Sequence, residues 1–372
     1  MSRMLNHRSR AAAIGLTAAA LVAVMITGCA ANSAETPSES TGPPPSAAPV
    51  TGLFPELSSL PSGPSAELIT AAKKESGKLT TYLSFSPPAM QAIFDAFKKE
   101  YPFVTDGETI ELSASKVEAR IVQESLASGK TGDYGETPAN YLLDLLARDL
   151  MLPLDAKELG VPAEMMDNEF MVTVSSNLYG LAINTDLVKE SERPHTWADL
   201  LDPAWSGNKI AMWTNAASLG NLAPVWGETA LLDYVAKIVE QKPSMFGGAT
   251  AVVQAIGAGE VPLGITTYHQ VMAAAEKGTP IAWYPLEVVT VSVSQAYVPL
   301  NAENPSTGKL FLSWFASKGY DLKEQVTFRG VPNLPGSTKA VVGDNELSGW
   351  RTDQSEEKDA IEAKVSELLP RG

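Results

Sequence analysis

Strand and helix patterns alternate along most of this chain, and this alternation constrains its fold more than any other feature of the sequence. It begins with a helix pattern at 66–74 and a strand pattern at 79–85. The next pattern is a helix that carries Met90, Ile93 and Phe97 on one side. Strands that alternate with helices of about 10–15 residues predict α/β layers with mostly parallel sheets. Further strands are expected at 109–112, 178–184, 209–213, 261–266, 281–285 and 288–300, and further helices at 116–127, 142–150, 197–201, 230–241, 250–258, 271–276 and 307–316.

The N-terminus has the layout of a secretory signal peptide over residues 1–28. Three arginines precede an apolar stretch at 11–26, which is shorter than the ~20 residues that a membrane-spanning helix needs. Cys29, the single cysteine of the chain, directly follows Thr27-Gly28 and resembles the lipidated cysteine of a bacterial lipobox. We therefore expect a lipid anchor at Cys29 that holds the protein on the outer face of the cell membrane. The alternative is an unmodified thiol after an ordinary signal peptide.

Composition excludes several classes of function. The 372 residues carry a net charge of −15, and removal of residues 1–28 leaves 25 basic and 43 acidic residues, a net charge of −18. Such a surface argues against nucleic-acid binding, which needs a basic patch. One cysteine also excludes cysteine-based zinc sites and iron–sulfur clusters. Residues 29–65 are rich in Ala, Ser, Pro, Gly and Thr, which predicts a disordered tether before the folded part.

Five segments carry a resemblance to a known family: 77–84, 97–102, 179–188, 194–212 and 304–316, of which 179–212 is the most specific. In this order they resemble type II periplasmic solute-binding proteins of the iron(III)-type family of ABC importers. The resemblance implies two α/β lobes joined by crossing strands, with an interlobe cleft that takes a solute and delivers it to a membrane permease. On this basis we expect the first lobe at 66–183 and 290–372, the second lobe at 184–289, and a monomer.

Two loops are candidates for ligand contacts. Ser84 and Ser86 follow the first strand, where hydroxyls can bind oxyanions; alternatively, a serine there caps the next helix. The second loop follows the strand at 209–213, and its aromatic, hydroxyl and amide groups form a plausible binding loop. The alternative is a tryptophan packed under the loop and a hydroxyl that caps a helix. The candidates in this second loop are Trp213, Thr214, Asn215 and Ser218.

Tyr268 and His269 stand where ferric-binding members of the resembling family carry adjacent tyrosines. Phenolate oxygen suits Fe(III), whereas histidine is a borderline ligand, so the iron motif is incomplete. A second phenolate would have to come from Tyr284 or Tyr297. Three interpretations stay open: a structural role, metal ligation by Tyr268 and His269, or an organic ligand that stacks on Tyr268 and accepts a hydrogen bond from His269. The expected solute is thus a ferric ion or chelate, or a small anionic organic compound such as a phosphonate, a phosphorylated molecule or a thiamine-like compound, with no resident cofactor.

An enzymatic alternative is a serine acyl-transferring lipoprotein of the penicillin-binding or β-lactamase type. Ser113–Lys116 fits S-x-x-K, Lys130–Gly132 fits K-T-G and Ser175–Asn177 fits S-x-N. The order argues against it, because the K-T-G precedes the S-x-N. We therefore expect no enzymatic activity. A third class, a lipoprotein that presents a surface to another protein without binding a solute, is disfavoured by the two-lobe pattern.

Overall fold

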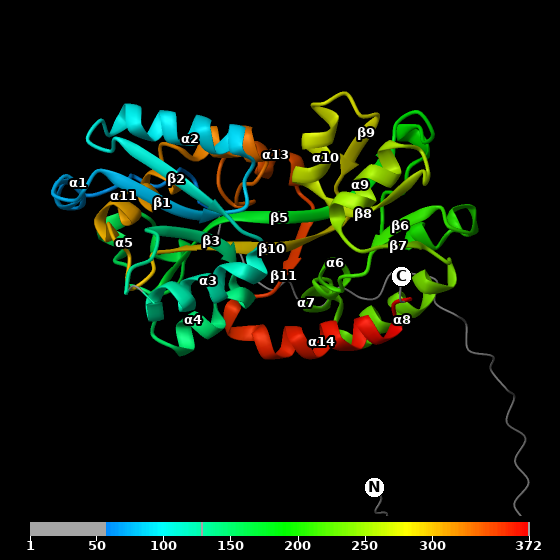
Figure 1. Ribbon diagram of the computed structural model, residues 1–372. Coiled ribbons are helices and arrows are strands. Elements are labelled where there is room, and N and C mark those ends of the chain that lie inside the picture. The colour runs from blue at the N-terminus through cyan, green and yellow to red at the C-terminus, as the bar shows by residue number, and fades with distance from the viewer. Residues whose placement is uncertain (1–56, 128, 371–372) are drawn as a thin grey trace, which may run out of the picture. The chain divides into compact units, whose positions relative to one another are not determined.

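The strands of this protein join in one mixed sheet that runs through two groups of helices (Figure 1). The computed structural model describes residues 57–127 and 129–370. The predicted signal peptide, the predicted lipidation site at Cys29 and the predicted tether up to residue 56 lie outside the described residues. The sheet order is β2-β1-β3-β10-β5-β8-β6-β7, with β11 on β10 and with β4 and β9 on β5. The strands are β1 (Lys78–Leu83), β2 (Asp106–Glu111), β3 (Tyr134–Pro138), β4 (Met166–Asn168), β5 (Met171–Asn184), β6 (Ile210–Trp213), β7 (Ser244–Phe246), β8 (Leu263–Thr267), β9 (Ile281–Tyr284), β10 (Val288–Tyr297) and β11 (Glu346–Gly349).

Two long antiparallel strands, β5 and β10, belong to both halves of the sheet. The first part of β5 carries Val172 in one apolar core, and its last part carries Leu181 and Ile183 in another. β10 runs in the opposite direction and pairs with β3 at its end and with β11 at its start. These strands are the crossing strands that the sequence predicts, although β5 begins seven residues earlier than the expected strand at 178–184. A nearly continuous buried run explains this length, because both faces of a central strand are covered.

The first lobe packs helices around β1 to β4, and its core is aromatic. The ring of Phe311 lies edge-on to those of Phe97 and Tyr134, with centroids at 5.0 and 4.9 Å, and is stacked on Phe315 at 5.1 Å. Such pairs add to the free energy of burial because ring edges are positive and ring faces negative. The helices of this lobe are α1 (Ala66–Ala72), α2 (Pro87–Glu100), α3 (Ala114–Ala127), α4 (Leu143–Ala147), α5 (Ala156–Leu159), α11 (Pro305–Ala316) and α12 (Tyr320–Thr327).

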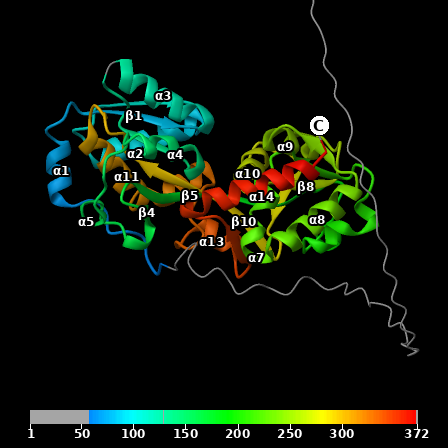
Figure 2. The same cartoon turned by 90° about the horizontal axis from the view of Figure 1, so that it is seen from below.

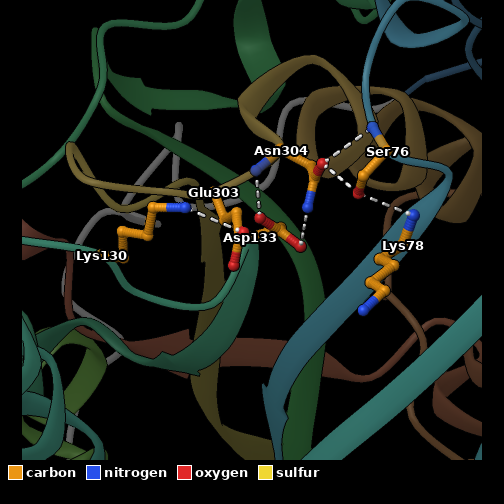
Figure 3. A network of polar contacts seen from close by, with 6 residues as sticks. All are labelled: Ser76, Lys78, Lys130, Asp133, Glu303 and Asn304. Carbon is orange, nitrogen blue, oxygen red and sulfur yellow. Dashed lines mark hydrogen bonds and ion pairs between the residues drawn. The ribbon is translucent and has the colours of Figure 1, made fainter. Parts of the chain in front are cut away.

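The buried carboxylate of Asp133 connects the start of α11 to β1 through hydrogen bonds (Figure 3). Asp133 accepts hydrogen bonds from the backbone N–H of Thr80 at 2.9 Å and of Asn304 at 2.6 Å. The amide oxygen of Asn304 in turn accepts from the hydroxyl of Ser76 at 2.7 Å. Burial raises the pKa of Asp133, while the hydrogen bonds from Thr80 and Asn304 oppose that rise. The network therefore fixes where α11 starts relative to β1.

The second lobe has its own core around Trp197. This side chain is fully buried, its indole N–H donates to the carbonyl of Val288 at 2.8 Å, and its ring lies edge-on to those of Trp226 and Tyr234. The helices here are α6 (Ala217–Gly220), α7 (Ala223–Trp226), α8 (Glu228–Glu240), α9 (Ala249–Gly257) and α10 (Tyr268–Ala275); α13 (Ser337–Val342) and α14 (Ser355–Leu368) follow later in the chain. Short 3₁₀ turns occur at Ala139–Tyr141, Ala163–Met165, Glu190–Glu192, Ala198–Leu201, Pro203–Trp205 and Thr352–Gln354.

Two parts of the structure depart from the expected domain boundaries. The sequence assigns 290–372 to the first lobe, but α14 buries Ile361 and Val365 in the second core, beside α8 (Figure 2). The predicted tether extends to residue 65, but residues 57–65 pack on the first lobe, where the backbone N–H groups of Ser62 and Ser65 donate to the carbonyls of Gly160 and Glu158. Leu57 and Leu60 also pack against the first core, so in both places a few apolar side chains dock a short segment on a core. No helix within residues 57–370, apart from the undescribed position 128, is long and apolar enough to cross a membrane.

Candidate functional site

A cavity of about 700 Å³ is lined by segments from both lobes. The first lobe contributes the loop after β1 and the end of α12, and the second lobe contributes α10. This places the cavity between elements that belong to separate cores, as in a cleft between lobes. Its lining residues are Ser84, Phe85, Ser86, Pro88, Ala89, His269, Gln270, Ala273, Glu276, Lys277, Gln325, Val326, Thr327, Phe328 and Arg329.

The loop after β1 brings Ser84 and Ser86 to the cavity, and both side chains are exposed. Ser86 is the N-cap residue of α2, but its side chain makes no capping hydrogen bond. The next two residues are prolines, so the first turn of α2 has few N–H groups to cap. The capping alternative for Ser86 is therefore not realised, and its hydroxyl is available to a ligand.

The N-terminal end of α10 brings His269 and Gln270 to the cavity. Tyr268, the first residue of the helix, points elsewhere: it is 7% exposed and its ring lies edge-on to that of Trp283, with centroids 5.2 Å apart. Burial, with a smaller contribution from Glu324, raises the pKa of the Tyr268 phenol. The two neighbours in sequence thus have different environments, one in the core of the second lobe and one on the cleft.

Arg329 is one of three charged residues that line the cleft, with Glu276 and Lys277, and it follows a residue with left-handed backbone, Phe328 (φ 55°). This conformation ends α12 and turns the chain toward the cavity. The guanidinium of Arg329 donates from Nη2 to Nε2 of His269 at 2.9 Å and lies over the ring of Phe85, with Cζ 5.4 Å from the centroid. Among residues 57–127 and 129–370, no carboxylate forms an ion pair with Arg329. Burial lowers its pKa, but an arginine side chain stays protonated in proteins.

The contact with Arg329 defines the state of His269. A guanidinium has no acceptor, so Nε2 must be the unprotonated nitrogen and Nδ1 carries the proton. Burial, reinforced by the positive charge of Arg329, holds the pKa of His269 well below 6.5. Nδ1 is buried and has no hydrogen-bond partner among the described residues. His269 is therefore neutral, and it links the second lobe to a cation that the first lobe supplies.

The remaining predicted ligand residues do not line this cavity. Trp213 packs against the second lobe, the backbone N–H of Thr214 donates to Phe246, and the amide oxygen of Asn215 accepts from the N–H of Ala217. Ser218 is buried inside α6, whose N-cap residue is Ala216, so no hydroxyl caps this helix. The ring of Tyr284 is covered by the guanidinium of Arg193, 4.1 Å from its centroid. Ligand binding by these five residues stays a prediction.

A metal site at Tyr268 and His269 gains little support from this geometry. The lone pair of His269 Nε2 faces a cation, Arg329, and Tyr268 lies among aromatic rings with a raised pKa, which opposes the phenolate form. No cluster of three or more His, Cys, Asp or Glu side chains that could hold a metal ion occurs in the described parts of the chain. The structure instead offers a positive charge, which attracts an anion.

A smaller cavity of about 150 Å³ adjoins the cleft, and Ser84, Phe85 and Arg329 line both. No pattern in the sequence pointed to Arg329 or to Glu136, which lines this smaller cavity. Of the segments of the enzymatic alternative, Ser113–Lys116 and Ser175–Asn177 each contribute one residue, Ala114 and Asn177, to the wall of the smaller cavity. The third does not line it: Lys130 forms an exposed ion pair with Glu303 at 2.9 Å (Figure 3). The hydroxyl of Ser175 is buried and donates to Glu136.

Comparisons with known proteins agree with this two-lobed geometry. Residues 83–319 match the family described as bacterial extracellular solute-binding protein. The chain belongs to this family. Extracellular solute-binding proteins of this kind are the solute-binding subunits of ABC importers, so the expected fold class and general function are confirmed.

Solved structures share the fold at low sequence identity. Iron-bound HitA from Pseudomonas aeruginosa superposes with a TM-score of 0.61 at 19% identity, over 77% of this chain and 99% of HitA. AfuA from Actinobacillus pleuropneumoniae, with fructose-6-phosphate bound, superposes with a TM-score of 0.60 at 18% identity, over 79% of this chain and 99% of AfuA. PotD from Streptococcus pneumoniae, the substrate-binding protein of a spermidine/putrescine ABC transporter, superposes with a TM-score of 0.59 at 17% identity, over 78% of this chain and 99% of PotD. A search of curated protein sequences gives no match. The ligands of these three proteins differ in charge and size, so the likeness shows the fold and leaves the solute to the site.

Proposed function

We propose that this extracellular solute-binding protein captures a small organic anion in its cleft, with Arg329 as the main contact to the anionic group. The observation that carries the proposal is a half-buried guanidinium that lines the cavity and has no carboxylate within ion-pair distance among the described residues. Guanidinium presents several N–H donors in one plane, which matches the oxygens of a carboxylate or phosphate.

Two further features of the cavity favour an anion, while Glu276 and Lys277, which also line it, carry opposite charges. The first N–H groups of α10 have no partners within the helix, and the helix dipole adds partial positive charge at this end. Ser84 and Ser86 supply hydroxyls from the first lobe. Donors from both lobes thus surround one volume, and a ligand that needs all of them stabilises the closed arrangement by its differential affinity.

Ferric iron is the alternative to test, because iron-bound HitA shares the fold. It would meet a cation at Arg329 and a histidine whose free nitrogen is already engaged. An organic anion needs no change in either group. We therefore propose an organic anion, in preference to ferric iron, as the solute.

The experiment is native mass spectrometry of the purified protein, followed by calorimetry with the co-purified compound or with a panel of carboxylates and phosphates. Arg329→Gln is expected to weaken binding about ten- to hundredfold, because a hydrogen bond to a charged group contributes about 1.5–3 kcal/mol. Arg148→Gln is the matched control, since Arg148 is exposed and pairs with Asp144 on the surface. Equal affinities of the wild type and Arg329→Gln for every anion would contradict the proposal. A visible phenolate charge-transfer band after iron loading, lost in Tyr268→Phe, would replace it with ferric binding.

We also propose that Cys29 carries a lipid that keeps this receptor close to its permease. A lipid and a short tether raise the effective concentration of the receptor at the membrane. Metabolic labelling with an alkyne fatty acid is expected to mark the wild type and not Cys29→Ser. An unlabelled wild-type protein in the culture medium would contradict the anchor.

A further inference from the structure

The smaller cavity beside Arg329 has a polar wall of its own. Apart from the three residues that it shares with the cleft, its lining comes from β3, from the crossing strands β5 and β10, from the start of α3 and from Leu112 after β2. It opens next to the cleft, because three residues line both volumes. The lining residues are Ser84, Phe85, Leu112, Ala114, Val117, Glu136, Thr137, Pro138, Asn177, Ser294 and Arg329.

Two polar atoms in this wall lack partners. Thr137 is 2% exposed, and its hydroxyl has no hydrogen-bond partner among the described residues; the same is true of the amide oxygen of Asn177. Buried polar atoms are nearly always hydrogen-bonded, so an unpartnered pair on one small cavity points to a group that fills it. Asn177 Oδ1 can only accept, and Thr137 Oγ1 can accept or donate. The missing partner must therefore bring at least one hydrogen-bond donor.

A bulge in β5 accounts for the space of the smaller cavity. Ser294 of β10 pairs with Ser175 of β5, and the next pair is Gln295 with Thr173, so Val174 is an extra residue in β5. Such a bulge bends the strand and re-aims neighbouring side chains. The bulge lies at Ser294, which lines the cavity.

The charges around the smaller cavity favour a neutral hydrogen-bond donor over a cation. Glu136 is 7% exposed and accepts hydrogen bonds from the hydroxyls of Tyr134, at 3.2 Å, and Ser175. Two cations, the buried Lys323 and the half-buried Arg329, interact favourably with this carboxylate. Because the charge of Glu136 is already balanced within the protein, an ammonium group would be repelled by both cations, whereas a hydroxyl would not.

We propose that this subsite receives hydroxyl groups of the solute, so that the preferred ligand is a small polyhydroxylated anion. Its anionic group lies on Arg329 in the cleft, and its hydroxyls donate to Asn177 and bond with Thr137 in the smaller cavity. The inference rests on the proposed function, since it assumes an anion at Arg329, and it adds the chemical class of the rest of the ligand.

The test compares anions that differ only in hydroxyl groups. The probes are sn-glycerol 3-phosphate against propyl phosphate, glycerate against propionate, glucitol 6-phosphate against hexyl phosphate, and gluconate against hexanoate, measured by calorimetry on the full mature chain. For at least one pair, the hydroxylated member is expected to bind about tenfold or more tightly. Thr137→Val is expected to reduce that preference about two- to tenfold, the effect of one neutral hydrogen bond. Thr338→Val is the matched control, because this threonine is 1% exposed, has an unpartnered hydroxyl among the described residues and lines neither cavity.

The outcomes separate the two proposals. If bare and hydroxylated anions bind equally and Arg329→Gln weakens both, the subsite proposal is overturned while the anion site stands. An undiminished hydroxyl preference in Thr137→Val also overturns it. If none of the eight probes binds and the Arg329→Gln variant still carries the wild type's co-purified compound, both proposals fall.

Discussion

Substitution of Lys323 by methionine is expected to remove a rise in stability between about pH 7 and pH 9.5. Lys323 is fully buried on α12, and its ammonium group lies over the rings of Tyr320 and Phe315, at 4.7 and 5.0 Å from their centroids. It donates to the carbonyl of Val174, the extra residue of the bulge in β5. Burial lowers the pKa of Lys323 from 10.5 to about 8, although Glu136 and Glu324 act in the opposite direction.

The size of the effect follows from the two pKa values. The folded protein releases this proton near pH 8, whereas the unfolded chain holds it to about pH 10.5. Between these values the unfolded state binds more protons, so the free energy of unfolding rises with pH. At 1.36 kcal/mol per pH unit, the rise from about pH 7 to pH 9.5 amounts to about 2 kcal/mol.

Urea denaturation of the wild type and of Lys323→Met, at four pH values across this range, measures the effect. The variant lacks the donor to the Val174 carbonyl, and this loss lowers its free energy of unfolding by about 1–3 kcal/mol at every pH. The measurement therefore compares how the free energy of unfolding changes with pH in the two proteins, and not its absolute value. Lys99→Met is the control, because Lys99 is an exposed lysine of α2 and its curve should stay parallel to that of the wild type. Parallel curves for the wild type and Lys323→Met would refute the reasoning.

Two further predictions concern His269 and Asp133. Because the pKa of His269 is held well below 6.5 by burial and by Arg329, the unfolded chain takes up this proton first as the pH falls, and stability should decline below about pH 6.5. In His269→Gln, whose amide oxygen can still accept from Arg329, melting temperatures between about pH 5 and pH 8 should show a smaller decline, and an unchanged decline would count against a buried neutral histidine. Asp133→Ala should lower the free energy of unfolding by at least about 2 kcal/mol, because it leaves the N–H groups of Thr80 and Asn304 without their acceptor. Asp95→Ala, at an exposed position of α2, is the control for that measurement, and equal losses in the two variants would contradict the role of the Asp133 network.

The sequence by itself determined the alternation of strands and helices, because this information is local. The helix before Tyr101 shows the reason: Met90, Ile93 and Phe97 recur at helical spacing and are buried on one face of α2. It likewise placed Ser84 and Ser86 at the end of a strand, which is where the cleft lies. Family membership followed from such segments taken in order, and it extends over residues 83–319.

Only the tertiary structure decided which polar groups meet. Arg329 lies 60 residues from His269 in the chain, yet their side chains share a hydrogen bond, because the crossing strands return the chain to the first lobe before α12. Tyr268 and His269 are neighbours in sequence, but helix geometry directs one into a core and the other to the cleft. On the second lobe, α14 buries Ile361 and Val365, whose i, i+4 spacing indicates a buried helix face but not the lobe that covers it. Local periodicity reports which face of an element is buried, whereas the partner of that face is chosen by contacts between distant parts of the chain.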